Sequence, residues 1–154
     1  MLQINALLIF SDGSSKGRAG YLINNQQVII ETPGLSAQLA ELTAVLKVFQ
    51  SVHEAFNIFT DSLYVAQLVP LLETCGTFNF NTSSGSLFSE LQNIILVRKN
   101  PFYIGHIRSH SGLPGPLAEG NDRIDRALIG EALVSDPVAL AQRIMKGFIS
   151  LAIP

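Results

Sequence analysis

Four acidic residues are placed where their side chains can reach a common point. Asp12 directly follows an apolar segment typical of a strand, and Asp61 directly follows another. Ligands of α/β sheets bind where strands end, so the two acids become neighbours if their strands are neighbours. Glu41 belongs to the first turns of the helix before the second strand, and Asp125 to the last expected helix. The pattern predicts a carboxylate cluster at one end of a sheet.

Converging carboxylates favour divalent cations. Two of them about 4 Å apart repel each other by roughly 4 kcal/mol at a surface-like dielectric. Oxygen ligands with no cysteine and few histidines favour Mg²⁺ or Mn²⁺ over zinc. Two such ions about 4 Å apart can activate a water and stabilise the leaving oxygen of a phosphodiester. A convergence of Asp12, Glu41, Asp61 and Asp125 would therefore suit divalent cations and the phosphodiester chemistry that two of them can support.

Each acid also has a purely structural interpretation. Asp12 before Gly13 can form a turn, and Asp61 before Ser62 can begin a helix. Glu41 can be a solvated helix residue, as most helical glutamates are. Taken singly, each acid favours its structural interpretation, and only the set of four favours chemistry.

Hydrophobic patterning predicts the elements that position these acids. The expected strands are Ile4–Phe10, Arg18–Ile23, Val28–Thr32, Phe56–Thr60 and Phe102–Ile107. The expected helices are Ser36–Val52, capped by Ser36, then Ser62–Leu72, Leu87–Val97 and Glu119–Leu128. The expected turns and loops are Ser11–Ser15, Asn24–Gln26, Thr74–Gly85 and His110–Gly120. This order predicts an α/β domain with a five-stranded mixed sheet and helices on both faces.

Composition narrows the class of protein. A chain of 154 residues can bury a real core, and its 47% hydrophobic and 14% charged residues exclude a disordered or coiled-coil protein. The single cysteine, Cys75, excludes an internal disulfide and fits a reducing intracellular location, cytoplasmic or nuclear. No apolar run reaches about 18 residues, so we expect no membrane segment. The net charge of −2 is unusual for a nucleic-acid binder, because phosphate affinity is largely electrostatic.

The acids lie in short motifs that occur in order along the chain. These motifs are Ser11-Asp12-Gly13-Ser14, Ala37-Gln38-Leu39-Ala40-Glu41-Leu42, Thr60-Asp61-Ser62 and Gly120-Asn121-Asp122-Arg123-Ile124-Asp125. From about Leu7 to Leu128 the chain thereby resembles the ribonuclease H family, in its retroviral reverse-transcriptase branch. The segment 106–116 is similar to that of beta- and alpharetrovirus-like elements, which include endogenous ones. The resemblance implies a ribonuclease H-like fold and an endoribonuclease that cuts the RNA strand of an RNA–DNA hybrid.

Position by position, the resemblance implies roles for single residues. Asp12, Glu41, Asp61 and Asp125 match the family's catalytic metal-binding acids. His110 matches a loop histidine that helps product release or proton transfer. His53 and His106 have no acidic neighbour at a useful spacing, and we interpret them as ordinary structural residues. Residues that match hybrid contacts are Gly13, Ser14, Gln38, Ser62 and Asn121. Neutral groups of this kind can recognise a 2′-hydroxyl without a basic surface.

Two departures from the family pattern predict weak substrate binding. The segment Thr74–Gly85 is neutral where some members carry a basic helix and loop. Leu63 stands where relatives often have a polar residue. We therefore expect a polymerase domain or another protein to supply part of the affinity for the hybrid.

The last residues differ in character from the rest. We predict a domain over residues 1–130 and a tail over 131–154 without the histidines and cysteines of an integrase zinc module. Ser135-Asp136-Pro137 is typical of a helix start, which predicts a short helix in the tail. Its apolar stripe indicates packing on the domain or on a partner.

Other functions remain open at this point. A retained viral domain could bind hybrids or a protein partner without cutting, although the intact acids argue against decay. Another nuclease of the same superfold, such as a transposase or exonuclease, is disfavoured by His110 and Asn121. The segment Gly13–Gly17 matches the serine-hydrolase pattern Gly-x-Ser-x-Gly, but a strand follows where that mechanism needs a helix.

Overall fold

A five-stranded mixed sheet forms the centre of the molecule. The computed structural model describes residues 2–24, 26–74, 85–107, 121, 123–125 and 128. The strands are β1 (Leu7–Ser14), β2 (Arg18–Ile23), β3 (Gln26–Glu31), β4 (Phe56–Thr60) and β5 (Phe102–His106). The helices are α1 (Ala37–Ser51), α2 (Leu63–Thr74) and α3 (Gly85–Val97). The strand order is β3-β2-β1-β4-β5, with β4 parallel to β1 and β5 and with β2 antiparallel to both of its neighbours. The predicted fold class is confirmed.

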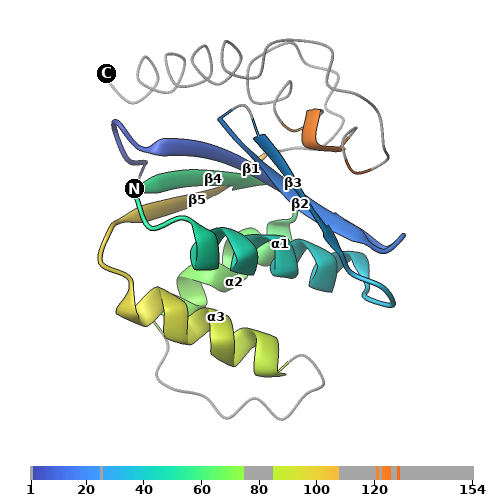
Figure 1. The fold of residues 1–154 in the computed structure, drawn as a ribbon. Helices are drawn as coiled ribbons and strands as arrows, with labels where there is room; N and C mark the ends of the chain where they lie inside the picture. Colours follow the sequence, from blue (N-terminus) through green and yellow to red (C-terminus); the bar gives the residue numbers. More distant parts are fainter. Residues whose placement is uncertain are drawn as a thin grey trace.

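Apolar layers lie on both faces of the sheet. Helices α1, α2 and α3 cover one face (Figure 1), where Ile9 of β1 packs with Phe49 of α1 in the larger core cluster. On the other face Leu8 and Phe10 pack with Ile124, one of the described helical residues between 121 and 128. Side chains alternate between the faces along a strand, so three consecutive apolar residues of β1 serve both layers. This continuous apolar run explains why β1 can be central and buried.

The first strand differs from its predicted bounds. Asn5 has a φ of 61°, in the left-handed region, so Ile4 and Asn5 form a turn and the strand begins at Leu7. The strand then continues through Ser11–Ser14, which composition predicts as a turn, because Asp12 pairs with Gly20 of β2 and Ser14 with Arg18. Asp12 therefore lies within a paired strand instead of in a loop.

The other described boundaries agree with the predictions to within two residues. Strands β2 and β4 have their predicted bounds, and α1 follows Ser36, whose Oγ accepts a hydrogen bond from Leu39 N at 3.3 Å. Strand β3 begins two residues early because Asn24, with a φ of 52°, makes the turn tight. No helix in the described part of the chain is long and apolar enough to span a membrane.

Several predicted segments lie outside the described residues. They are the loop residues 75–84, the segment 108–120 with His110, and the tail 131–154. Thr74 and Gly85, predicted as the ends of a loop, belong to α2 and α3.

Candidate active site

Three of the four predicted acids converge at the carboxyl ends of β1 and β4. These strands are parallel neighbours, with Ser11 paired to Thr60, so Asp12 and Asp61 follow paired positions. Glu41 approaches from the second turn of α1. One side-chain oxygen from each of Asp12, Glu41 and Asp61 lies within 4.8 Å of the other two. Asp12, Glu41 and Asp61 thus form a carboxylate cluster at one end of the sheet, where the sequence pattern predicted one.

Gly13 allows α1 to approach the strand closely enough for Glu41 to join the cluster. A Cβ atom at Gly13 would lie 2.2 Å from the backbone nitrogen of Glu41 and 2.5 Å from the carbonyl carbon of Ala40. Neither contact is possible without a backbone shift. The Gly13 amide also donates a hydrogen bond to Asp12 Oδ1 at 2.8 Å. Gly13, predicted as a substrate contact, therefore has a positioning role within the chain.

Asp125 joins the cluster from the opposite side of the sheet. It lies among the helical residues that pack through Ile124 against β1, and its side chain is hydrogen-bonded to Asp12. The charge of Asp125 and this hydrogen bond both raise the pKa of Asp12. The fourth predicted acid is therefore next to the first, outside the tight group that Asp12 forms with Glu41 and Asp61.

The electrostatics of the cluster favour protons or cations. Burial, and secondly the charge of Asp61, raise the pKa of Asp12 from 3.8 to about 8, although the hydrogen bond from Gly13 opposes the shift. Burial raises the pKa of Glu41 from 4.5 to about 7, opposed by a hydrogen bond from Ser62. Both carboxyls thus resist ionisation unless a positive charge compensates them.

The metal-free chain should lose stability as pH rises through the neutral range. Because both pKa values are raised on folding, the folded state binds more protons than the unfolded state between about pH 4 and pH 8, so the free energy of unfolding falls with pH there. Urea unfolding in chelator at pH 5, 7 and 9 measures this slope, and Asp12→Asn should flatten it. A free energy that is constant or rises over this interval would contradict the raised pKa values.

The predicted substrate contacts occupy varied positions around the cluster. Ser62 is buried, accepts a hydrogen bond from Val65 N at 3.2 Å as the cap of α2, and bonds to Glu41. Ser14 Oγ accepts from Lys16 N in the β1–β2 turn. Gln38 is exposed on the first turn of α1. Asn121 is buried, and its Oδ1 has no hydrogen-bond partner among the described residues. Ser62 and Ser14 are thus engaged within the chain, the Gln38 side chain is exposed, and the Asn121 side chain is buried.

One neighbour of the cluster, His106, was missed by the sequence analysis. It ends β5, and its Nε2 lies 3.2 Å from the backbone carbonyl oxygen of Asp61. The parallel register pairs His106 with Thr60 and so carries the histidine to the end of β4. Asp61 and His106 are 45 positions apart in the chain. Only knowledge of the β4–β5 register could therefore have placed His106 next to Asp61.

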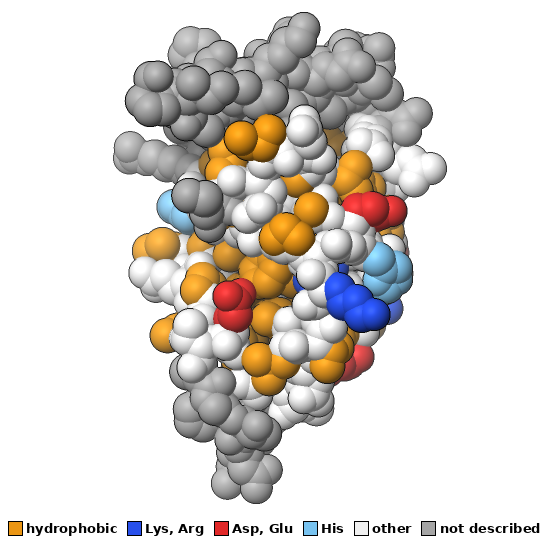
Figure 2. Space-filling view, turned by 90° about the vertical axis from the view of Figure 1, so that its left-hand side faces the viewer, with side chains coloured by type: hydrophobic (Ala, Val, Ile, Leu, Met, Phe, Trp, Pro, Cys, Tyr) orange, Lys and Arg blue, Asp and Glu red, His pale blue; other side chains and the backbone are white. Residues whose placement is uncertain are grey.

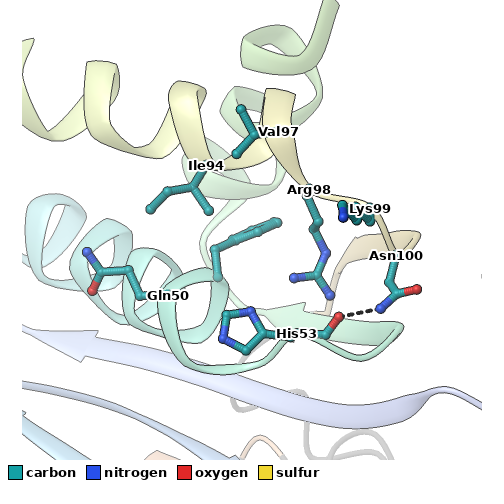
Figure 3. Close-up of a pocket in the computed structure, with 8 residues that line it drawn as sticks. Gln50, His53, Ile94, Val97, Arg98, Lys99 and Asn100 are labelled. Atoms are coloured by element: carbon teal, nitrogen blue, oxygen red, sulfur yellow. Dashed lines mark hydrogen bonds between the residues drawn. The ribbon is translucent and has the colours of Figure 1, made fainter.

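A pocket lies at the opposite end of β4 and is chemically different (Figure 3). Its volume is about 470 Å³, and its lining residues are Phe49, Gln50, His53, Ile94, Val97, Arg98, Lys99 and Asn100. The Arg98 guanidinium lies 4.4 Å from the centroid of the Phe56 ring and donates to the carbonyls of Val52 and Glu54. Figure 2 shows this end of the molecule, where apolar side chains gather among a few charged ones. None of the eight lining residues is acidic, so the candidate active site is the carboxylate cluster.

The mixed sheet with acids at the ends of its central parallel strands defines an α/β domain with a candidate metal-binding site of carboxylates. Comparison with known families then specifies the group: the chain belongs to the RNase H family, which matches residues 4–132. This result also confirms the resemblance noted from the four acidic motifs.

The chain is similar to part of several retroviral polyproteins. It is 53% identical over 134 residues to the Gag-Pro-Pol polyprotein of squirrel monkey retrovirus, covering 86% of this chain. It is 47% identical over 124 residues to that of Mason-Pfizer monkey virus and 44% identical over 120 residues to that of mouse mammary tumor virus, strain BR6, covering 80% and 77% of this chain. The chain spans 7% of the length of each of these polyproteins. The family and these relatives together identify a retroviral RNase H domain.

Proposed function

We propose that the chain is an endoribonuclease that hydrolyses the RNA strand of RNA–DNA hybrids with two divalent cations, Mg²⁺ or Mn²⁺. The observation that carries this proposal is the group of carboxylate oxygens from Asp12, Glu41 and Asp61 within 4.8 Å of one another. Membership of the RNase H family supports the same reaction.

The residues of the cluster fit hard divalent cations. All donors are carboxylate oxygens, the ligands that Mg²⁺ and Mn²⁺ prefer. The raised pKa values of Asp12 and Glu41 indicate negative charge that a cation would compensate. We propose Asp12, Glu41, Asp61 and Asp125 as the ligands. When bound, the cations would supply activation of a water and stabilisation of the leaving oxygen.

The chain's own groups hold and orient the ligands and the substrate. The Gly13 amide fixes one oxygen of Asp12, and Ser62 fixes Glu41. Gln38 lies one turn before Glu41 on α1, where its exposed amide can bind a ribose 2′-hydroxyl. Asn121, four residues before Asp125, is proposed as a further contact to the hybrid. His110, which lies outside the described residues, is proposed to transfer a proton or assist product release.

Substrate affinity is the second part of the proposal. The chain has a net charge of −2, so long-range attraction of a hybrid is weak. The relatives it matches are much longer polyproteins. We propose that a polymerase region or another protein supplies additional contacts to the hybrid, and that the isolated chain cleaves with a high KM.

A labelled RNA–DNA hybrid incubated with Mg²⁺ or Mn²⁺ tests the proposal. The unmodified chain should cleave the RNA strand only, and chelator should stop the reaction. Asp61→Asn should lose cleavage, whereas Glu73→Gln, an exposed acid on α2 away from the cluster, should retain it. Hybrid binding without cleavage in all three proteins would show a binding module instead of an enzyme. Equal cleavage by the Asp61→Asn variant would exclude the proposed centre.

A further inference from the structure

The peptide segment that carries Asp61 is held from β5 at two points. Asp61 follows the last residue of β4, where the chain leaves the sheet to enter α2. Ile107 N donates to Thr60 O at 2.9 Å. His106 Nε2 lies 3.2 Å from Asp61 O. The backbone before Asp61 and the carbonyl of Asp61 itself are therefore both tied to the end of the neighbouring strand.

The chemistry of the second contact fixes the role of the histidine. A carbonyl oxygen can only accept a hydrogen bond, so His106 Nε2 must carry the hydrogen and donate it. The series of helical bonds in α2 starts one residue later, where Ser62 O accepts from Ala66 N. His106 thus donates to the Asp61 carbonyl at the junction of β4 and α2. This carbonyl lies between Thr60 O, which bonds to β5, and Ser62 O, which begins the helical bonds of α2.

This contact acts on the orientation of the Asp61 side chain. Each peptide unit is planar, so holding the units on both sides of Asp61, through Thr60 O and Asp61 O, fixes its φ and ψ and thereby the direction of its Cα–Cβ bond. Asp61 must point toward Glu41 and Asp12 for the three oxygens to approach as they do. The next residue, Ser62, is held as well, because its backbone amide donates a hydrogen bond to Thr60 Oγ1 at 3.1 Å. The His106 contact adds a second hydrogen bond to the Asp61–Ser62 peptide unit, at its carbonyl oxygen.

We propose that His106 is a positioning residue that orients Asp61 for cation binding by donating a hydrogen bond to its backbone carbonyl. The inference rests on the proposed metal-dependent function. The side chain of His106 is exposed and lies on the edge strand β5, so its role is separable from the folding of the core. Outer-shell partners of metal ligands commonly change metal affinity about 10- to 100-fold when removed.

Three variants and a direct binding measurement test this role. His106→Ala removes the donor. His106→Gln keeps an amide N–H that can reach the same carbonyl. His53→Ala removes an exposed histidine at the opposite end of the sheet and serves as the matched control. Calorimetric titration of each full chain with Mn²⁺ in the absence of substrate gives the metal affinity, and the melting temperature in chelator reports folding.

We expect His106→Ala to weaken Mn²⁺ binding about tenfold with the chelator melting temperature unchanged. His106→Gln should recover most of the affinity, and His53→Ala should bind as the unmodified chain does. Unchanged Mn²⁺ affinity in His106→Ala, or no recovery in His106→Gln, overturns the positioning role while leaving the metal centre intact. If the unmodified chain binds Mn²⁺ no better than Asp61→Asn does, the proposed metal centre itself fails, and the inference fails with it.

Discussion

Asp12→Asn is expected to abolish RNA cleavage and at the same time to stabilise the metal-free chain. Loss of a charged ligand at the centre of the cluster should reduce kcat/KM roughly 10³-fold or more, as removal of principal catalytic groups does in other enzymes. The neutral amide also removes the charge that burial and Asp61 disfavour. One pKa unit corresponds to about 1.4 kcal/mol, so above about pH 8, where Asp12 is ionised in the metal-free chain, the variant should gain at least about 2 kcal/mol in unfolding free energy.

Opposite effects on activity and stability distinguish this interpretation from simple damage. A substitution that only disturbs packing lowers both quantities. Cleavage of a labelled hybrid in Mn²⁺ and urea unfolding at pH 9 in chelator measure the two effects on the same samples. Glu31→Gln is the control, because Glu31 is exposed and paired with Arg18 away from the cluster. If Asp12→Asn lowered the unfolding free energy at pH 9, the electrostatic strain assigned to Asp12 would be wrong.

The convergence of the acids could be predicted because it depends on topology. Asp61 follows an apolar strand and Asp12 follows the apolar run of another, and parallel neighbouring strands end at one edge of a sheet. The cap residue Ser36 and the apolar face of α1 likewise mark a helix that brings Glu41 into the same region. The roles of these acids as metal ligands remain a prediction from the family and their geometry.

Other features depended on tertiary contacts and could not be predicted. The composition of Ser11–Ser14 is that of a turn, yet pairing with β2 keeps these residues in a strand. His106 looked isolated because its partner, Asp61, reaches it only through the β4–β5 register. The raised pKa of Asp12 requires its burial and its two acidic neighbours, Asp61 and Asp125, to be known together.

The residues predicted to contact the hybrid differ in how far the structure agrees with that role. Gln38, which the resemblance matches to a hybrid contact, is exposed on α1, and its contact with the hybrid stays a prediction. Ser62 was predicted as a substrate contact, yet it caps α2 and bonds to Glu41. A serine directly before a helix is a common cap, so the capping role is also consistent with the sequence. The structure thus shows a structural role for Ser62, and its contact with the substrate stays a prediction.

Gly13→Ala is expected to destabilise the chain by about 3 kcal/mol or more, since insertion into a well-packed site commonly costs that order of free energy. The added methyl group would lie 2.2 Å from Glu41 N and 2.7 Å from Glu41 Cα, so either the helix or the strand must move. The same displacement would carry Glu41 away from Asp12 and Asp61. Metal-dependent cleavage should therefore fall even in the fraction of molecules that still folds.

Gly34→Ala provides the matched comparison for this substitution. Gly34 has a φ of 77° and no heavy atom within 4 Å of an added Cβ, so its replacement costs only backbone strain, about 1 kcal/mol. Urea unfolding of both variants in chelator separates steric contact from conformational strain, and the Gly13 variant should be clearly the less stable. If the Gly13→Ala chain were as stable as the Gly34→Ala chain and cleaved at the full rate, α1 would not be in close backbone contact with β1 at Gly13. The approach of Glu41 would then need another cause, because the close contact at Gly13 is what brings the first turns of α1 against the strand that carries Asp12.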